Sequence, residues 1–139
     1  MKQEEAVAFA EQWVKDWNAH DVEAVLAHFA DDAVFTSPLA ERLFPESGGV
    51  ISGKDALRRY WSEGIRSGPG LRFELLDVYA GVGTIVIRFR NERGTDRCEV
   101  LTFDGGLVAT GHGADLATSG QTARAGGRGS RTRSELACF

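Results

Sequence analysis

Cysteine and histidine are scarce in this chain, and long apolar runs are absent. The two cysteines, Cys98 and Cys138, and the three histidines stand at no spacing that is typical of a disulfide framework or a metal site. We therefore expect free thiols and neither a metal nor another cofactor. No apolar run approaches the roughly 18 to 20 residues of a membrane helix, and the acidic start, MKQEEAVAFAEQW, is unlike a signal peptide. These absences predict a cytoplasmic protein without a membrane partner.

Phosphate loops and nucleic-acid binding are disfavoured as well. The stretch SGGVISGKD at 47–55 does not have the order of glycines, lysine and hydroxyl residue that a phosphate-binding loop requires. The net charge is −4, and residues 117–139 contain four arginines and one glutamate, so this segment carries +3 and the rest of the chain −7. An acidic body argues against nucleic acid as the main partner.

The segment 117–139 differs in composition from the rest of the chain. It consists mainly of Gly, Ser, Thr, Ala and Arg and offers little apolar surface to bury. We predict one domain over residues 1–116, which is an ordinary domain size, followed by a disordered basic tail. A tail that contacts RNA or an anionic surface is the alternative to a dispensable extension.

Helical spacing dominates the first part of the sequence. Apolar residues recur at this spacing over residues 3–18, which predicts a helix. Asp21 can cap a second, shorter helix whose apolar side includes Phe29. The two helices would form a hairpin, and AVFT at 33–36 would follow as a short strand.

A proline ends that strand. Ser37 precedes Pro38, and the residue before a proline is pushed out of the helical region. We expect a loop over residues 39–51. A third helix would follow, with Ser52 as its cap and Asp55 reaching back, and it would end at residues 68–70, Gly-Pro-Gly.

From residue 71 the apolar period changes to two. Four strands are predicted, at 71–80, 84–90, 96–103 and 107–112. The short connections between them favour an antiparallel meander. Three helices followed by such a sheet make an α+β domain in which the helices cover one concave face.

Four motifs occur in order along the chain: WNAHD (17–21), HFADDAVF (28–35), GKDAL (53–57) and FDGGLVATGH (103–112). With the order of elements, they make residues 3–115 resemble the nuclear transport factor 2-like superfamily, in particular its SnoaL-like branch, which includes ketosteroid isomerases and polyketide cyclases. The resemblance implies a cone, in which a curved antiparallel sheet encloses a pocket that three N-terminal helices plug, and a homodimer through the outer sheet face. Because members range from isomerases, cyclases, dehydratases and epoxide hydrolases to plain binding modules, function stays open.

Ser37 occupies a position that matters in the ketosteroid isomerase pattern. There, the residue before the proline is an aspartate that abstracts a proton next to a carbonyl. A serine is a poor base without a histidine to take its proton. Ser37 therefore either assists another base or satisfies a backbone group in a Ser-Pro turn.

Glu99 matches the position of the second hydrogen-bond donor of that pattern, a protonated aspartic acid. Strand alternation puts it on one face with Leu101 and Phe103, which we expect to be concave. Burial there would raise the pKa of its carboxyl and make it an acid or base near pH 7. The alternative is a place at the open rim, or an ion pair with Arg88 or Arg90.

Histidines and arginines supply the remaining candidates. His112 ends the last strand and could pair with Glu99 across neighbouring strands, or it could be structural. His20 and His28 are expected in a turn and at a helix end. The epoxide hydrolase relatives use an Asp-Arg-Asp arrangement, and the Arg88 and Arg90 pair has no aspartate between or just after it, which disfavours that branch.

We predict a cofactor-independent enzyme that transfers protons on an apolar carbonyl compound, with Glu99 as acid or base and His112 or Ser37 assisting. Large apolar side chains would bind the compound in a hydrophobic pocket. The predicted ligand-binding residues are Trp13, Trp17, Phe35, Tyr60, Trp61, Leu101 and Phe103. In the resemblance, Trp13 replaces a tyrosine that donates to the enolate, and we expect it to be pocket wall. The alternatives are a non-catalytic module that binds a hydrophobic molecule or dimerises, and a protein-binding domain like nuclear transport factor 2.

Overall fold

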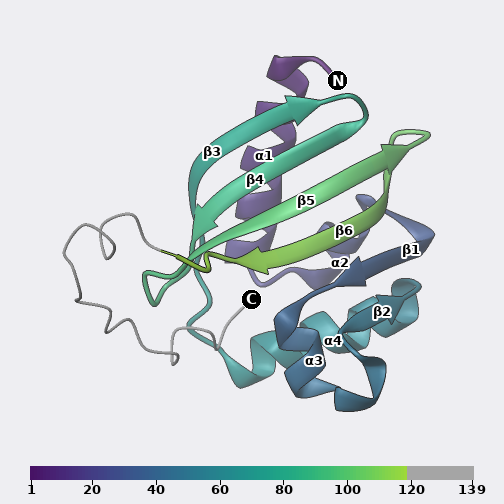
Figure 1. Ribbon diagram of the computed structural model, residues 1–139, viewed down its shortest axis with the longest axis vertical. Coiled ribbons are helices and arrows are strands. Elements are labelled where there is room, and N and C mark those ends of the chain that lie inside the picture. The colour runs from purple at the N-terminus through teal and green to yellow at the C-terminus, as the bar shows by residue number, and fades with distance from the viewer. Residues whose placement is uncertain (119–139) are drawn as a thin grey trace.

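One curved sheet of six strands organises residues 1–118, the part of the chain that the computed structural model describes (Figure 1). The strands are β1 (Phe29–Thr36), β2 (Val50–Ser52), β3 (Glu74–Gly81), β4 (Thr84–Arg90), β5 (Asp96–Asp104) and β6 (Leu107–Asp115). Their order is β2-β1-β6-β5-β4-β3. Strands β3 to β6 form the predicted antiparallel meander, but β1 pairs with β6 in parallel, so the sheet as a whole is mixed.

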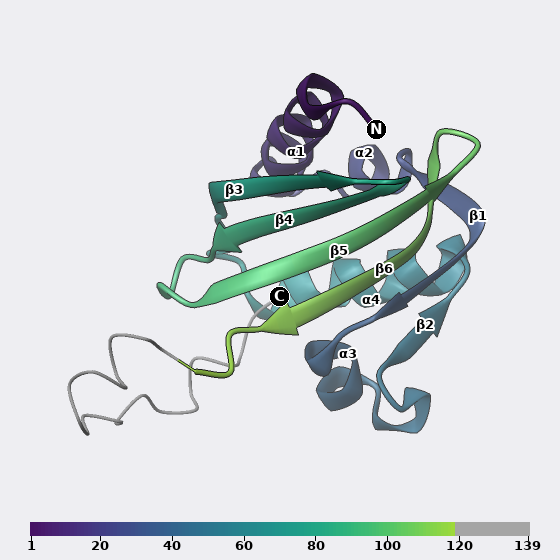
Figure 2. The ribbon, with the colours of Figure 1, turned by 45° about the horizontal axis from the view of Figure 1, so that its top comes forward.

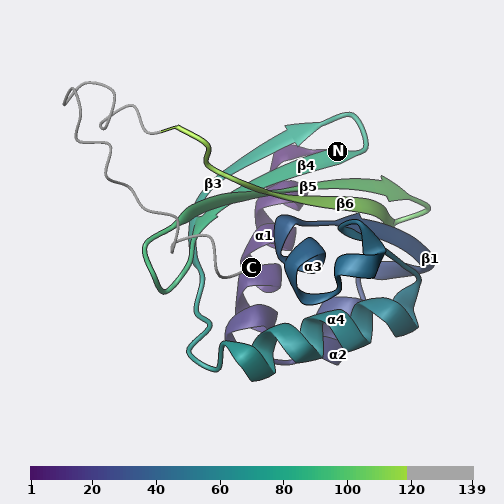
Figure 3. The same ribbon diagram turned by 60° about the horizontal axis from the view of Figure 1, so that its bottom comes forward.

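The helices cover one face of this sheet. They are α1 (Gln3–Asn18), α2 (Val22–Leu26), α3 (Pro38–Leu43), the 3-10 helix η1 (Pro45–Ser47) and α4 (Lys54–Ser67). Figure 3 shows α1, α3 and α4 together on the same side of the sheet, and Figure 2 shows the other face of β4, β5 and β6 without a helix over it. The predicted α+β class, with helices packed on a curved sheet, is therefore confirmed.

Two boundaries near the start of the sheet differ from the prediction. Asp21 caps α2, since its Oδ1 accepts a hydrogen bond from the Ala24 N–H at 3.1 Å. However, α2 ends at Leu26, and Phe29 begins β1 instead of continuing the helix. Phe29 lies opposite Val108 of β6. This long-range pairing, which has no local signature, extends β1 beyond the predicted AVFT.

The predicted loop over 39–51 is wrong, because this segment contains α3, η1 and β2. Ser37 caps α3 and Pro38 takes its first helical position, a combination that favours a helix start. Ser52 does not cap α4, because it lies in β2 opposite Val34. Gly53 is the cap residue, with a φ of +89° that glycine adopts without strain.

The core lies between the concave face of the sheet and helices α1 and α4. Alternate residues of β4 and β5 point into it, and large aromatic residues of the helices pack against them. Gly111 of β6 lies opposite Leu101 of β5. A Cβ at this position would lie 2.8 Å from Phe35 Cδ1 and 3.0 Å from Leu101 Cδ2. Glycine here therefore lets Phe35 lie against the sheet.

No helix in residues 1–118 has both the length and the apolar character needed to cross a bilayer. The cytoplasmic location and the division at residue 116 stay predictions. Of the proposed basic tail, residues 119–139 lie outside the described part of the chain.

Candidate active site

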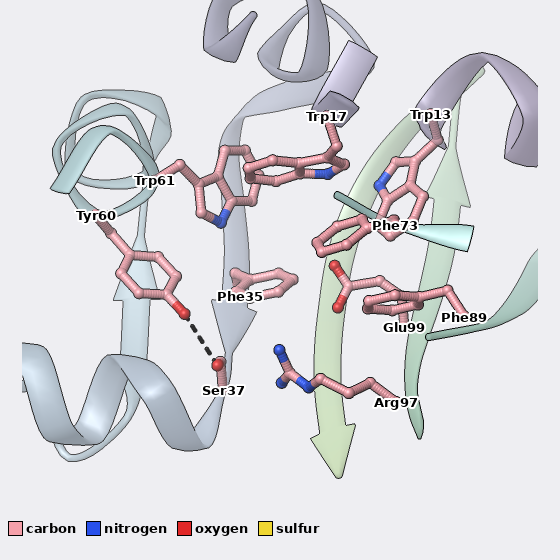
Figure 4. A pocket seen from close by; sticks show the side chains of 10 residues that line it. All are labelled: Trp13, Trp17, Phe35, Ser37, Tyr60, Trp61, Phe73, Phe89, Arg97 and Glu99. Atoms are coloured by element: carbon pink, nitrogen blue, oxygen red, sulfur yellow. Dashed lines mark hydrogen bonds between the residues drawn. The ribbon is translucent and has the colours of Figure 1, made fainter. Parts of the chain in front are cut away.

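A small cavity lies between the sheet and helices α1 and α4 (Figure 4). Its lining consists of Trp13, Trp17, Phe35, Ser37, Tyr60, Trp61, Phe73, Phe89, Arg97 and Glu99. The cavity measures about 10 Å³, which is room for roughly one water molecule. The aromatic side chains thus largely fill the interior themselves, and a ring-sized ligand requires some of them to move.

Glu99 is buried in this aromatic surrounding. It lies on β5 opposite Ile87 of β4 and Gly113 of β6, and only 6% of its surface is exposed. Burial raises the pKa of its carboxyl to about 7, and the positive charge of Arg97 offsets part of this rise. Near neutral pH, Glu99 can therefore either give or take a proton.

Arg97 is the second charged residue of the cavity, and it is 3% exposed. Its Nε donates to Asp115 Oδ1 at 2.6 Å, across the β5–β6 pair. A Cβ on Gly113 would lie 3.1 Å from Glu99 Oε2 and 3.3 Å from Arg97 Nη2. Three charged side chains thus form a row on the concave face, in the order Asp115, Arg97 and Glu99. Gly113, which has no side chain, leaves room for Arg97 and Glu99.

Arg97 is not among the site residues predicted from the sequence. The signal was present in DRCEVLTF, because strand alternation places Arg97 on the same face as Glu99. Arg88 and Arg90, the alternative partners for Glu99, lie on the outer face instead, because they are opposite Cys98 and Asp96 in the register of β4 and β5. Their guanidinium groups bind Asp77, Asp96 and Glu74.

Ser37 lines the cavity and is 6% exposed. Its Oγ accepts hydrogen bonds from the Leu39 N–H at 3.1 Å and from the Tyr60 hydroxyl at 2.9 Å. Burial raises the pKa of Tyr60, so its phenol keeps the donated proton. A hydroxyl has two acceptor sites and one proton. With both acceptor sites in use, the proton of Ser37 is left to donate.

Trp13 brings a buried donor to the same space. Its Nε1–H has no hydrogen-bond acceptor among the described residues, and its ring stacks on Phe73 with 5.6 Å between centroids. A buried donor without a partner costs about 1 to 3 kcal/mol. An acceptor oxygen on a bound molecule would recover that cost.

His112 does not join Glu99. Its side chain is exposed, and its Nδ1 lies 2.7 Å from Thr36 Oγ1. In the register of the sheet, His112 lies opposite Val100, whereas Glu99 lies opposite Gly113. Since side chains alternate along a strand, the ring and the carboxyl are on opposite faces. The predicted pair of Glu99 and His112 is wrong.

The predicted ligand-binding residues divide into two groups. The structure places Trp13, Trp17, Phe35, Tyr60 and Trp61 in the cavity lining, and their role in binding stays a prediction. Leu101 is fully buried beside Gly111 and outside the lining. Phe103 packs against Phe9, with 5.2 Å between the ring centroids. Neither residue lines the cavity, because only part of the concave face reaches it, and their role in binding also stays a prediction.

The other histidines have local structural roles, as predicted. His20 lies in the turn after α1, with its Nε2 2.9 Å from the Leu71 carbonyl oxygen. His28 follows α2, and its Nε2 lies 3.1 Å from Asp16 Oδ2. Within residues 1–118, no three His, Cys, Asp or Glu side chains gather closely enough to hold a metal ion.

Burial of Glu99 makes the stability of the fold depend on pH. In the unfolded chain its pKa is 4.5, and in the folded protein it is about 7. Between pH 4.5 and about 7, the unfolded chain loses this proton while the folded protein keeps it. The free energy of unfolding therefore falls as pH rises over this range and levels off above about pH 7. We expect the free energy of unfolding to fall by about 3 kcal/mol more in the wild type than in Glu99→Gln between about pH 4.5 and 8. Urea unfolding at both pH values measures this, and parallel pH dependences would show that Glu99 titrates normally.

Comparison with known proteins places the chain in a family. The model of the SnoaL-like domain matches residues 10–131. A SnoaL-like protein of unknown function from Burkholderia thailandensis is 32% identical and superposes with a TM-score of 0.79, covering 84% of this chain and 98% of that one. Comparison with curated proteins gives no match.

Two more distant solved structures share the fold alone. A protein from Sinorhizobium meliloti that is assigned as a polyketide cyclase is 17% identical with a TM-score of 0.62, over 73% of this chain and 89% of that one. TerC, co-crystallised with polyporic acid, is 14% identical with a TM-score of 0.65, over 78% of this chain and 90% of that one. The family model spans most of the sequence, and the Burkholderia thailandensis relative is 32% identical over 84% of this chain. The chain therefore belongs to the SnoaL-like family.

Proposed function

We propose that this protein is an acid–base enzyme that moves a proton on a small, mostly apolar carbonyl compound without a cofactor. The observation that carries the proposal is the Glu99 carboxyl, which lies inside an aromatic cavity with its pKa raised to about 7. A general acid or base works best when its pKa is close to the working pH. The surrounding rings supply apolar area for a flat molecule.

The reaction begins with Glu99 ionised. Its carboxylate takes a proton from the carbon next to the carbonyl. The electron pair of the C–H bond forms a C=C bond, and the π electrons of the carbonyl move to its oxygen to give an enolate. The Trp13 N–H, which has no acceptor among the described residues, donates to this oxygen. Glu99, now protonated, returns the proton to the same or another carbon.

Ligand binding requires the cavity to enlarge, because its volume in this structure is about 10 Å³. Ligand pockets usually measure roughly 300 to 1,000 Å³. Rotation of aromatic side chains, among them Phe73 and Trp61, would enlarge the cavity. TerC shares the fold and was crystallised with polyporic acid, which supports a small-molecule ligand for this architecture.

Proton exchange in heavy water tests the proposal. Phenylacetone is a suitable probe because it combines one ring with an enolisable ketone. Exchange of its methylene protons is followed by NMR with the wild type and with Glu99→Gln, against a sample without protein. Acceleration that depends on Glu99 supports the proposal. Binding without acceleration would refute it and favour the non-catalytic binding module.

A second candidate reaction is favoured by the row of Asp115, Arg97 and Glu99. An acid–arginine–acid arrangement was disfavoured at Arg88 and Arg90, but it occurs here with a glutamate in one place. Protonated Glu99 would donate to an epoxide oxygen as its C–O bond breaks, while a water adds to the carbon and passes its proton to the Asp115 carboxylate. We place this second because Asp115 does not line the cavity. Hydrolysis of styrene oxide by the wild type would favour it.

We also propose a homodimer through the outer sheet face, which no helix in the described part of the chain covers (Figure 2). Val86 and Val100 lie opposite each other there and are half-buried. Burying them in a partner would stabilise association. We expect Val100→Arg to convert a dimer to a monomer in light scattering after gel filtration. Val82→Arg, at a position that is 98% exposed in the β3–β4 turn, is the matched control. A monomeric wild type would contradict the proposal.

A further inference from the structure

Gly113 of β6 lies beside both charged side chains of the cavity lining. It is opposite Glu99 in the register of β5 and β6. A Cβ on it would lie 3.1 Å from Glu99 Oε2 and 3.3 Å from Arg97 Nη2, so both atoms pack against the backbone of this one residue. Figure 4 shows the two side chains, which extend from the same face of β5 into the cavity.

The backbone conformation does not explain why residue 113 is a glycine. Positive φ angles, which favour glycine, occur at Gly53 and at glycines in turns, but not at Gly113. Glycine in the interior of a strand weakens it and often marks a place where another group approaches closely. The groups that approach Gly113 are the carboxyl and the guanidinium. The space that Gly113 leaves for them is therefore the physical reason for a glycine here.

The distance between these two groups affects how easily Glu99 ionises. Burial raises the pKa of its carboxyl to about 7, and the charge of Arg97 lowers it, an attraction that weakens with distance. Tyr60 of α4 is the other titratable group in the lining, and burial raises the pKa of its phenol, which stays neutral. The other elements around the cavity contribute aromatic side chains and Ser37. Asp115 of β6 faces the same row, where it binds Arg97 Nε at 2.6 Å.

We propose that Gly113 is a positioning residue: because it has no side chain, the Arg97 guanidinium and the Glu99 carboxyl lie against the same point of β6, and this spacing sets how readily Glu99 gives and takes a proton. The catalytic consequence rests on the function proposed above, whereas the effect on the ionisation of Glu99 does not.

Gly113→Ala tests the proposal. The added methyl group requires the carboxyl and the guanidinium to move by a few tenths of an ångström, which the ends of two long side chains can do. It also covers the carboxyl with apolar surface, and both effects favour the neutral acid. We expect the midpoint of the Glu99 titration, measured by NMR of the ¹³C-labelled carboxyl, to rise by about 0.5 pH units. The pH profile of phenylacetone exchange should move with it.

The matched control is Gly111→Ala, the same change two residues earlier on the same face of β6. A Cβ there would lie 2.8 Å from Phe35 Cδ1 and 3.0 Å from Leu101 Cδ2, which are carbon atoms without charge. This variant should be less stable to urea than Gly113→Ala, but its Glu99 titration should stay in place. An unchanged midpoint in Gly113→Ala, or equal shifts in both variants, would overturn the proposal.

A measurement on the wild type covers the case in which a variant does not fold. In ¹⁵N-arginine-labelled protein, the Arg97 Nε signal should shift with pH at the midpoint of the Glu99 titration, because the two groups lie against the same residue. An Arg97 signal that ignores this titration would also overturn the proposal. If Gly113→Ala shifts the titration but no protein exchanges protons on phenylacetone, only the proposed function fails. If exchange depends on Glu99 and Gly113→Ala leaves the titration unchanged, only the positioning role fails.

Discussion

We expect Glu99→Gln to slow the enzyme-dependent proton exchange of phenylacetone by about 10²- to 10⁴-fold, which is the usual contribution of a general base. The amide of glutamine keeps the size and nearly the shape of the side chain but cannot accept the proton. In the wild type, exchange should rise with pH through about 7 and then level off, because only the ionised carboxyl acts as a base. NMR in heavy water across this pH range measures both effects.

The matched control is Glu46→Gln, which makes the same chemical change on the exposed surface of η1. Its exchange rate and pH profile should equal those of the wild type. Affinity for phenylacetone should change little in Glu99→Gln, since the amide still fills the space. An exchange rate that Glu99→Gln leaves intact would remove Glu99 from the chemistry.

The concave face of the sheet was predictable from the sequence, because strand alternation is a local signal. Alternation along β5 places Glu99 on the concave face, and the same alternation places Arg97 on that face beside it. The pairing of β1 with β6 and the register between β5 and β6 are long-range properties, and the sequence did not reveal them. For that reason His112 was placed with Glu99, although one step along β6 moves a side chain to the other face.

The extent of the cavity was also beyond the sequence. Whether an inward-facing residue reaches the cavity depends on which helix packs over it. Phe103 lies under Phe9 of α1, whereas Glu99 faces the aromatic residues of α1 and α4. The strand end at the Ser-Pro step is confirmed, because β1 ends at Thr36, but α3 begins directly after it, and a Ser-Pro step is compatible with either a loop or a helix start.

Arg97→Met should destabilise the fold by about 3 to 5 kcal/mol, the range for breaking a buried ion pair by removing one partner. Methionine fills much of the arginine volume but leaves the Asp115 carboxylate, which is 16% exposed, without its 2.6 Å partner. It also removes the positive charge that lowers the pKa of Glu99. Urea unfolding at constant pH measures the loss in the free energy of unfolding.

The control for this variant is Arg90→Met on the outer face, where the arginine is 42% exposed and binds Asp96 at 3.0 Å. An exposed pair contributes only about 0 to 1 kcal/mol, so this variant should unfold almost as the wild type does. In a double-mutant cycle, Arg97→Met with Asp115→Leu should cost less than the sum of the single changes, because the double variant leaves neither charge unpaired. Additive costs, or equal losses at positions 97 and 90, would show that the buried row contributes no more to stability than an ion pair in solvent.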